Sequence, residues 1–315
     1  MRIYQRNDAS VGFLLMENLE NKQDVSSSRI RGRWLIKYWP EAEEFVYGKK
    51  YDVLIFQKVY QPKMAEAFDG IKILDICDPD WITNTSIRRI IESMDAVVVP
   101  TEMFRQFLSQ VTDKPVVVIP DRQDLEFFAS KKKLHRGTAR EAVWHGYSHN
   151  SHVLKAALPA LKRFGLELSI ISNEMVSVVS KADINKGSAI VERWSRWNLE
   201  TFCDEMIKSD ICIMPGSLHV NDRFKSNNKT TTAKALGMPV ATNAEDLKRL
   251  LDPKERIKDA EAGLEEVKKH YDIRDSVKEM KQLIENIRAR RSRDERQAVR
   301  LNQDSETSRE GKQMA

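Results

Sequence analysis

The sequence predicts an α/β protein of two Rossmann-like domains that face each other across a cleft, with a C-terminal helical extension. The chain has 315 residues, 41% of them hydrophobic, which is enough for two cores. Short apolar runs alternate with segments of helical spacing, as in parallel α/β layers. The alternation stops over the charged residues 131–140 and then resumes. We therefore predict a first domain over 1–130, a linker over 131–140 and a second domain over 141–270.

The individual elements follow from these patterns. Apolar runs predict strands at 11–16, 51–57, 72–76, 96–100 and 115–119, and in the second domain at 142–144, 166–172, 189–193, 210–214 and 239–242. Helical spacing predicts helices at 30–39, 83–93, 101–110, 152–164, 199–209 and 230–236, with Thr101 as an N-cap. From Pro253 to Arg293 the pattern is helical and charged, with a break near Tyr271. Residues 294–315 are polar, and we predict a disordered tail there.

Composition narrows the class of protein. No run of about 18 apolar residues occurs, and the N-terminus lacks a charged segment followed by an apolar core, so we expect neither a membrane-spanning helix nor secretion. Cys77, Cys203 and Cys212 form no CxxC pair and are expected to be reduced and buried in a cytoplasmic protein. No Cys/His pair has the spacing of metal ligands, so no metal site is predicted.

The net charge of +5 owes much to arginines near the C-terminus, which lie at 288, 290, 291, 293, 296 and 300. Two interpretations stay open. The arginines either extend the last helix into solvent or form a basic arm that binds nucleic acid or membrane headgroups through phosphates.

The segment Arg223 to Val240, RFKSNNKTTTAKALGMPV, pairs a basic, amide-rich loop with a helix that ends at Gly237. The N-terminus of a helix attracts anions, and Lys229 adds a cation in the first turn, where the dipole disfavours it. This arrangement predicts phosphate binding. The alternative is an ordinary surface helix between two strands.

These residues resemble the donor-binding signature of retaining GT-B glycosyltransferases of the group 1/family 4 type. Ser226, Lys229, Gly237, Pro239 and Val240 match it directly. The resemblance implies a nucleotide-sugar donor, held by Ser226, Asn228, Lys229, Thr230 and Thr232. In that family an acidic residue that binds the ribose occupies the position of Thr232. The resemblance also implies that a last helix, here 271–293, crosses back to the first domain, and that neither a cofactor nor a metal is required.

The second domain offers further donor contacts. In the loop WHGYSHNSHVL, Gly146 lets the backbone approach a phosphate, and His149 replaces part of the cationic pair that the family carries there, or is an ordinary loop histidine. Arg193 and Trp194 either contact the donor base or pack at the end of a strand. Arg223 or Lys225 is expected to neutralise the leaving diphosphate beside Lys229.

The first domain is expected to bind the acceptor. Ser28, Arg29 and Arg31 at a helix start either bind an anionic acceptor or the donor phosphate, or form a solvated face. Asp78 and Asp80 either supply a base and orient acceptor hydroxyls or belong to a turn. Their DxD spacing is a weak match to a metal-diphosphate bridge.

The resemblance implies transfer of a hexose or pentose to a hydroxyl with retention, with Lys229, Arg223 and Asp78 as the catalytic candidates. Two alternatives remain. The basic tail is compatible with a nucleic-acid-associated protein, including a glycosyltransferase that modifies DNA bases. Thr232 and the missing cationic pair are compatible with a non-catalytic protein that binds nucleotide-sugars.

Overall fold

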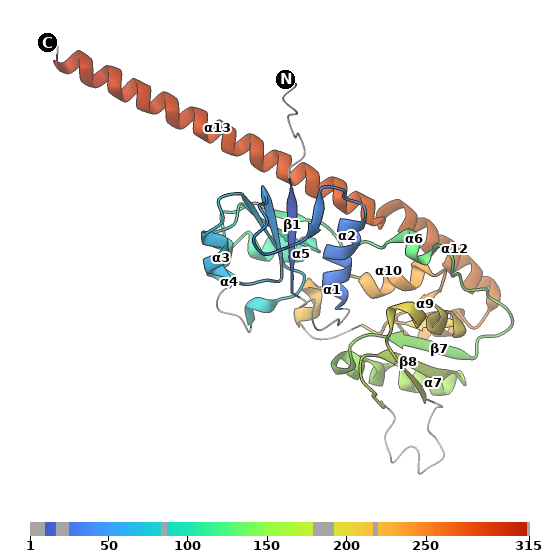
Figure 1. Cartoon of the computed structure of the whole chain (residues 1–315). Helices are drawn as coiled ribbons and strands as arrows, with labels where there is room; N and C mark the ends of the chain where they lie inside the picture. Colours follow the sequence, from blue (N-terminus) through green and yellow to red (C-terminus); the bar gives the residue numbers. More distant parts are fainter. Residues whose placement is uncertain (1–9, 17–24, 83–86, 179–191, 217–219, 314–315) are drawn as a thin grey trace, which may run out of the picture.

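The computed structural model describes residues 10–16, 25–82, 87–178, 192–216 and 220–313. It shows two parallel sheets, one in each half of the chain, flanked by helices (Figure 1). Two long C-terminal helices link them. This is the predicted α/β architecture of two Rossmann-like domains.

The first sheet has six strands in the order β2-β1-β3-β4-β5-β6, all paired in parallel. The chain therefore runs from β1 to β2 at one edge of the sheet. It then returns to the other side of β1, where β3 to β6 follow in order toward the opposite edge. The strands are β1 (Val11–Leu15), β2 (Ala42–Glu44), β3 (Val53–Gln57), β4 (Ile71–Asp75), β5 (Ala96–Val99) and β6 (Val116–Val118). Only β2 was not predicted, because its sequence AEE has no apolar run and it lies at the sheet edge.

The helices of the first domain largely follow the predicted pattern. The predicted helix 30–39 begins earlier, as a continuous helical segment made of α1 (Ser26–Ser28), the π-helical turn η2 (Arg29–Arg33) and α2 (Trp34–Lys37). The hydroxyl of Thr101 caps α5, as predicted, by accepting from the Phe104 backbone N–H. The others are α3 (Pro62–Glu66), η3 (Asp80–Ile82), α4 (Ile87–Glu92), α5 (Glu102–Leu108) and α6 (Leu125–Ala129). Residues 83–86 of the predicted helix 83–93 lie outside the described residues.

The second sheet has five parallel strands in the order β11-β10-β7-β8-β9. They are β7 (Glu141–His145), β8 (Glu167–Ser172), β9 (Glu192–Arg196), β10 (Ile211–Ile213) and β11 (Val240–Ala241). The strand predicted at 189–193 ends three residues later, at Arg196. Residues 189–191 lie outside the described residues, and β9 is a half-exposed edge strand whose sequence ERWSR carries little apolar signal.

The helices of the second domain are η4 (Ser148–Ala156), α7 (Leu158–Arg163), α9 (Leu199–Lys208), η5 (Val220–Phe224), α10 (Asn228–Ala235) and α11 (Ala244–Arg249). Helix α10 is the helix for which phosphate binding is predicted, and Gly237 lies in the turn that stops it, as predicted. Gly237 has a φ of 68°, and its N–H and that of Met238 donate to the carbonyls of Lys234 and Ala233. Glycine suits this left-handed turn because it has no Cβ.

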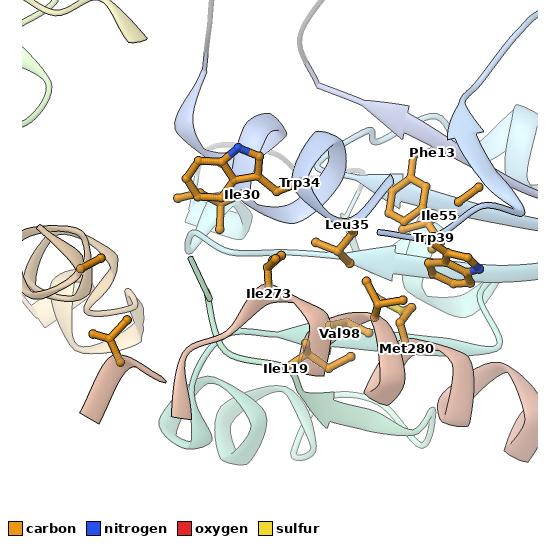
Figure 2. Packing of buried hydrophobic residues seen from close by; sticks show 14 of the residues in the cluster. Phe13, Ile30, Trp34, Leu35, Trp39, Ile55, Val98, Ile119, Ile273 and Met280 are labelled. Carbon is orange, nitrogen blue, oxygen red and sulfur yellow. The ribbon is translucent and has the colours of Figure 1, made fainter. Parts of the chain in front are cut away.

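The C-terminal helices join the two domains. Helix α12 (Pro253–His270) packs on α10, where Lys234 and Glu266 form an ion pair of 2.6 Å. After the predicted break at Tyr271, α13 (Ile273–Gln313) returns to the first sheet. Figure 2 shows Ile273 and Met280 of this helix beside Leu35 and Ile119. The described helices include none that is both long and apolar enough to cross a bilayer.

The predicted disordered tail 294–315 is helical through Gln313. The segment has no proline, its only glycine is Gly311, and Arg, Glu, Gln and Ala favour helix. Just before this segment, two arginines hold α13 against the first domain, since Arg291 pairs with Asp95 at 2.8 Å and Arg290 donates to the Asp95 carbonyl. The three cysteines are free and buried, as predicted.

Candidate active site

A cleft of about 730 Å³ lies between the two domains. Parallel α/β sheets bind ligands at the carboxyl ends of the strands, where the strand order reverses. In the first sheet that point lies between β1 and β3, and Lys58 directly follows β3. In the second it lies between β7 and β10, and Gly146 follows β7. Both residues line the cleft, so topology explains where the site forms.

Lys229, in the first turn of α10, is the cation at the second-domain wall. Its Nζ atom lies 5.4 Å from the centre of the Trp144 ring. Burial, and secondarily the charge of Lys225, lower the pKa of Lys229. The charges of Asp222 and Asp78 partly offset this lowering, but no carboxylate of the described residues lies within ion-pair distance of the lysine. A desolvated cation without a counterion is a site for an anion.

Gly146 makes room for this lysine. A Cβ atom at position 146 would lie 2.9 Å from the Lys229 Nζ and 2.8 Å from the Trp144 ring. Any larger residue would therefore displace the lysine or the ring. In the structure Gly146 allows the close approach of the Lys229 side chain, whereas the approach of its backbone to a phosphate stays a prediction.

Two residues of the first domain form hydrogen bonds with the start of α10 and the loop before it. Asp121 accepts hydrogen bonds from Ser226 Oγ at 2.5 Å and from Asn228 Nδ2 at 3.2 Å. Gln123 Nε2 donates to Thr231 Oγ1 at 2.9 Å, and Gln123 Oε1 accepts from Thr232 at 3.2 Å. The position of α10 therefore depends on both domains. Sequence analysis missed Asp121 and Gln123, since their partners lie more than a hundred residues away.

The predicted donor residues divide into two groups. Those that line the cleft are Gly146, His149, Lys225, Ser226, Asn228, Lys229, Thr230 and Thr232. Within this group, Lys225 is paired with Asp222 at 2.8 Å, His149 stacks on Tyr147, and Thr232 donates its hydroxyl to Gln123.

Three predicted residues are not among the cleft-lining residues. On the edge strand β9, Arg193 forms ion pairs with Glu141 of β7 and Glu167 of β8. Trp194, also on β9, donates its Nε1–H to Ser172, and its ring packs against the core of the second domain. For both, the alternative of strand-end packing describes the structure. Arg223 is exposed in η5, before the lysines that do reach the cleft.

On the first-domain wall, Lys58 and Asp78 face the cleft. Lys58 Nζ lies 2.7 Å from Asp78 and 3.3 Å from Asp80, and Tyr60 donates to Asp80. Lys58 has a φ of 53°, a left-handed conformation that costs free energy in a non-glycine residue and clusters at functional sites. Asp80 lies behind Asp78, outside the lining residues. A lysine directly after a strand was a signal that sequence analysis overlooked.

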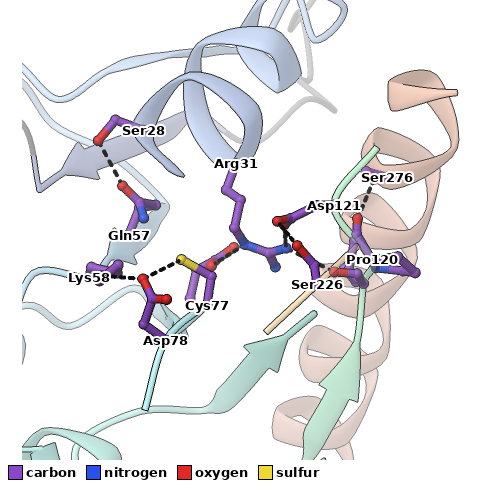
Figure 3. A network of polar contacts seen from close by, with 12 residues as sticks. Ser28, Arg31, Gln57, Lys58, Cys77, Asp78, Pro120, Asp121, Ser226 and Ser276 are labelled. Atoms are coloured by element: carbon purple, nitrogen blue, oxygen red, sulfur yellow. Dashed lines mark hydrogen bonds and ion pairs between the residues drawn. The ribbon is translucent and has the colours of Figure 1, made fainter. Parts of the chain in front are cut away.

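The residues at the arginine-rich helix start have two different surroundings, since one lines the cleft and the others belong to a buried polar network. Arg29 lines the cleft. Arg31 is 3% exposed and binds Asp75 at 2.5 Å and Asp121 at 2.6 Å, while Ser28 donates to Gln57 (Figure 3). Neither Ser28 nor Arg31 is among the cleft-lining residues. Arg31 instead connects the helix to Asp121 and, through it, to Ser226 of the donor loop.

His145, at the end of β7, is buried below Lys229, whose backbone carbonyl lies 3.2 Å from its Nε2. Burial, together with the charges of Lys229 and Arg29, lowers the pKa of His145 to about 3. The unfolded chain therefore binds a proton below about pH 6.5 that the native protein does not bind. We expect the free energy of unfolding to fall as the pH drops from about 6.5 toward 3, by up to about 1.4 kcal/mol per pH unit.

This prediction is checked by urea unfolding of the wild type and of His145→Gln between pH 4.5 and 7.5. The glutamine variant should show a shallower decline over this range. Equal slopes in both proteins would contradict a neutral, buried His145.

No group of three or more potential metal ligands among His, Cys, Asp and Glu occurs in the described part of the chain. What the cleft offers is cations, hydroxyls and amides on one wall and a lysine–carboxylate pair on the other. This set suits an anionic ligand next to a hydroxyl compound.

The two parallel sheets, the cleft between them and the returning C-terminal helix define the GT-B fold of glycosyltransferases. Solved structures agree. The HepE protein of Anabaena, in complex with UDP and glucose, matches with a TM-score of 0.67 at 9% identity over 89% of this chain and 100% of its own. TarM matches with a TM-score of 0.58 and 11% identity over 80% of this chain and 57% of TarM, so this chain spans little more than half of the TarM length. The DNA-modifying enzyme β-glucosyltransferase matches with a TM-score of 0.54 and 12% identity over 87% of this chain and 99% of its own. Neither a protein-family model nor a curated protein sequence matches the chain.

Proposed function

We propose that this protein is a glycosyltransferase that moves a sugar from a nucleoside-diphosphate sugar to an acceptor hydroxyl, with retention at the anomeric carbon and without a metal. One observation carries the proposal. Lys229 is a half-buried, desolvated cation at the start of α10, without an ion-pair partner in the described residues, in a cleft between two Rossmann-like domains. The fold shared with HepE, which was solved with UDP and glucose, supports the same donor class.

The chemistry requires charge stabilisation. When the bond between the sugar and the diphosphate breaks, negative charge grows on the leaving phosphate. A cation in a desolvated cleft interacts with that charge more strongly in the transition state than in the ground state. In this proposal Lys229 supplies that charge, and Lys225, whose ion pair with Asp222 is half-exposed, supports it.

The acceptor hydroxyl is assigned to the opposite wall. Asp78 lines the cleft there, and Lys58 holds its carboxylate at 2.7 Å. A carboxylate oriented in this way accepts a hydrogen bond from the attacking hydroxyl and raises its nucleophilicity. The acceptor class proposed is a glycan or a hydroxyl-bearing nucleic acid base, reached by a cytoplasmic protein.

The test is turnover of purified full-length protein with UDP-, GDP-, ADP- and CMP-linked sugars, followed by NMR of the released or transferred sugar. We expect one donor base to be preferred, the anomeric configuration to be retained, and EDTA to leave the rate unchanged. Binding of a nucleoside diphosphate without transfer or hydrolysis would support the non-catalytic alternative. Absence of both binding and turnover with every donor would overturn the proposal.

A further inference from the structure

Arg29 reaches the cleft from the first domain between two tryptophan rings. Its guanidinium carbon lies 4.9 Å from the centre of the Trp197 ring and 5.4 Å from that of Trp34. Trp34 belongs to α2 of the first domain, whereas Trp197 follows β9 of the second. Arg29 and Trp197 both line the cleft. The arginine therefore sits where the two domains meet.

Both rings are themselves held in place. Trp34 is 8% exposed and packs with Phe127 and Phe128, at ring-centre distances of 6.0 Å. The Trp197 backbone N–H donates to the Ser172 carbonyl at 2.9 Å, and its ring packs near Phe202. A guanidinium between aromatic faces keeps its charge and presents its N–H groups at its edge, the geometry that binds phosphate oxygens in pairs.

Arg29 and Lys229 act on the same part of the cleft. The Trp197 ring beside Arg29 packs near Phe202, whose ring centre lies 5.2 Å from that of His145. His145 Nε2 in turn lies 3.2 Å from the backbone carbonyl of Lys229. All of these residues line the cleft, and the charges of both cations lower the pKa of His145.

We propose that Arg29 is the second cation of the donor site and binds the diphosphate group across the cleft from Lys229. The inference rests on the proposed donor site and specifies its ligand as a nucleoside diphosphate rather than a monophosphate. Of the ligands that the sequence left open for Arg29, an anionic acceptor and the donor phosphate, it selects the donor phosphate. It also makes the diphosphate a bridge between the two domains.

The test is calorimetric titration of the full chain with UDP, GDP, UMP and GMP, comparing Arg29→Met with the wild type. We expect the affinity for the preferred diphosphate to fall about tenfold or more, because a charge-assisted contact is lost, and the affinity for the monophosphate to fall much less. Arg29→Lys keeps the charge without the planar fork and should recover part of the loss. Thermal unfolding of each variant verifies that it is folded.

Arg33→Met is the matched control, because Arg33 lies on the same helical segment and pairs with Glu44 at 2.9 Å, away from the cleft-lining residues. It removes the same charge and should leave both affinities unchanged. If Lys229→Met weakens diphosphate binding while Arg29→Met does not, the inference fails and the donor site stands. An Arg29→Met variant that raises only the KM for the acceptor would likewise overturn the inference. If the wild type binds none of the four nucleotides, the titration is repeated with ADP, AMP, CDP and CMP, and both proposals fail if none of these binds either.

Discussion

Lys229→Met is expected to weaken nucleoside-diphosphate binding by about 10- to 100-fold, because a charge-assisted contact to phosphate is worth about 1.5–3 kcal/mol. At the same time the variant should unfold at a higher temperature than the wild type. The lysine is desolvated and has no ion-pair partner in the described residues, so its charge costs folding free energy in the empty protein. Opposite changes in binding and stability are the mark of a ligand-binding cation.

Titration calorimetry and thermal unfolding without ligand measure the two effects. Lys234→Met is the control, since Lys234 lies on the same helix and pairs with Glu266 outside the cleft. It should lower stability slightly and leave affinity unchanged. A Lys229→Met variant that is less stable and binds normally would show that the lysine is a structural residue.

Arg31→Met is expected to destabilise the protein by about 3–5 kcal/mol, since removing one member of a buried ion pair leaves an uncompensated charge. Arg31 is the cation that joins Asp75 and Asp121, which are 1% and 5% exposed (Figure 3). Urea unfolding at pH 7 measures the loss. A change below about 1 kcal/mol would contradict the assignment, because it would fall in the range of a surface pair.

The pH dependence of this loss has a definite sign. Burial raises the pKa of Asp75 even when Arg31 is present, so the native state holds a proton more readily than the unfolded chain. Without Arg31 the pKa of Asp75 should rise further. The loss of unfolding free energy in Arg31→Met should therefore shrink as the pH is lowered toward 5. Adding Asp75→Asn to Arg31→Met should recover part of the loss at pH 7, which a double-mutant cycle detects.

The donor helix shows what a local pattern predicts well. A helix between two strands, a lysine in its first turn and a glycine just past its end are properties of neighbouring residues, and all three are found at α10. The buried strands were predicted for the same reason, since continuous apolar runs mark strands covered on both faces. Strands β2 and β9 lie at sheet edges, where this signal is weak.

Arg29 and Arg31 show where local patterns stop. The two arginines are two residues apart on a helical segment, so they point to different sides of it. One faces the cleft and the other is buried against Asp75 and Asp121. The sequence shows the cluster of charges, but the side that each one faces depends on how the helix lies on the sheet.

The sequence by itself determined the α/β class, most strands and the helix that carries Lys229, because those depend on interactions between near neighbours. Only the tertiary structure decided which residues join that segment at the cleft. Asp121, Gln123 and Lys58 reach it through the order of strands in the first sheet and the packing of one domain against the other. Such contacts join residues that are distant in the chain, and their free energy comes from burying surfaces that exist only after each domain has folded.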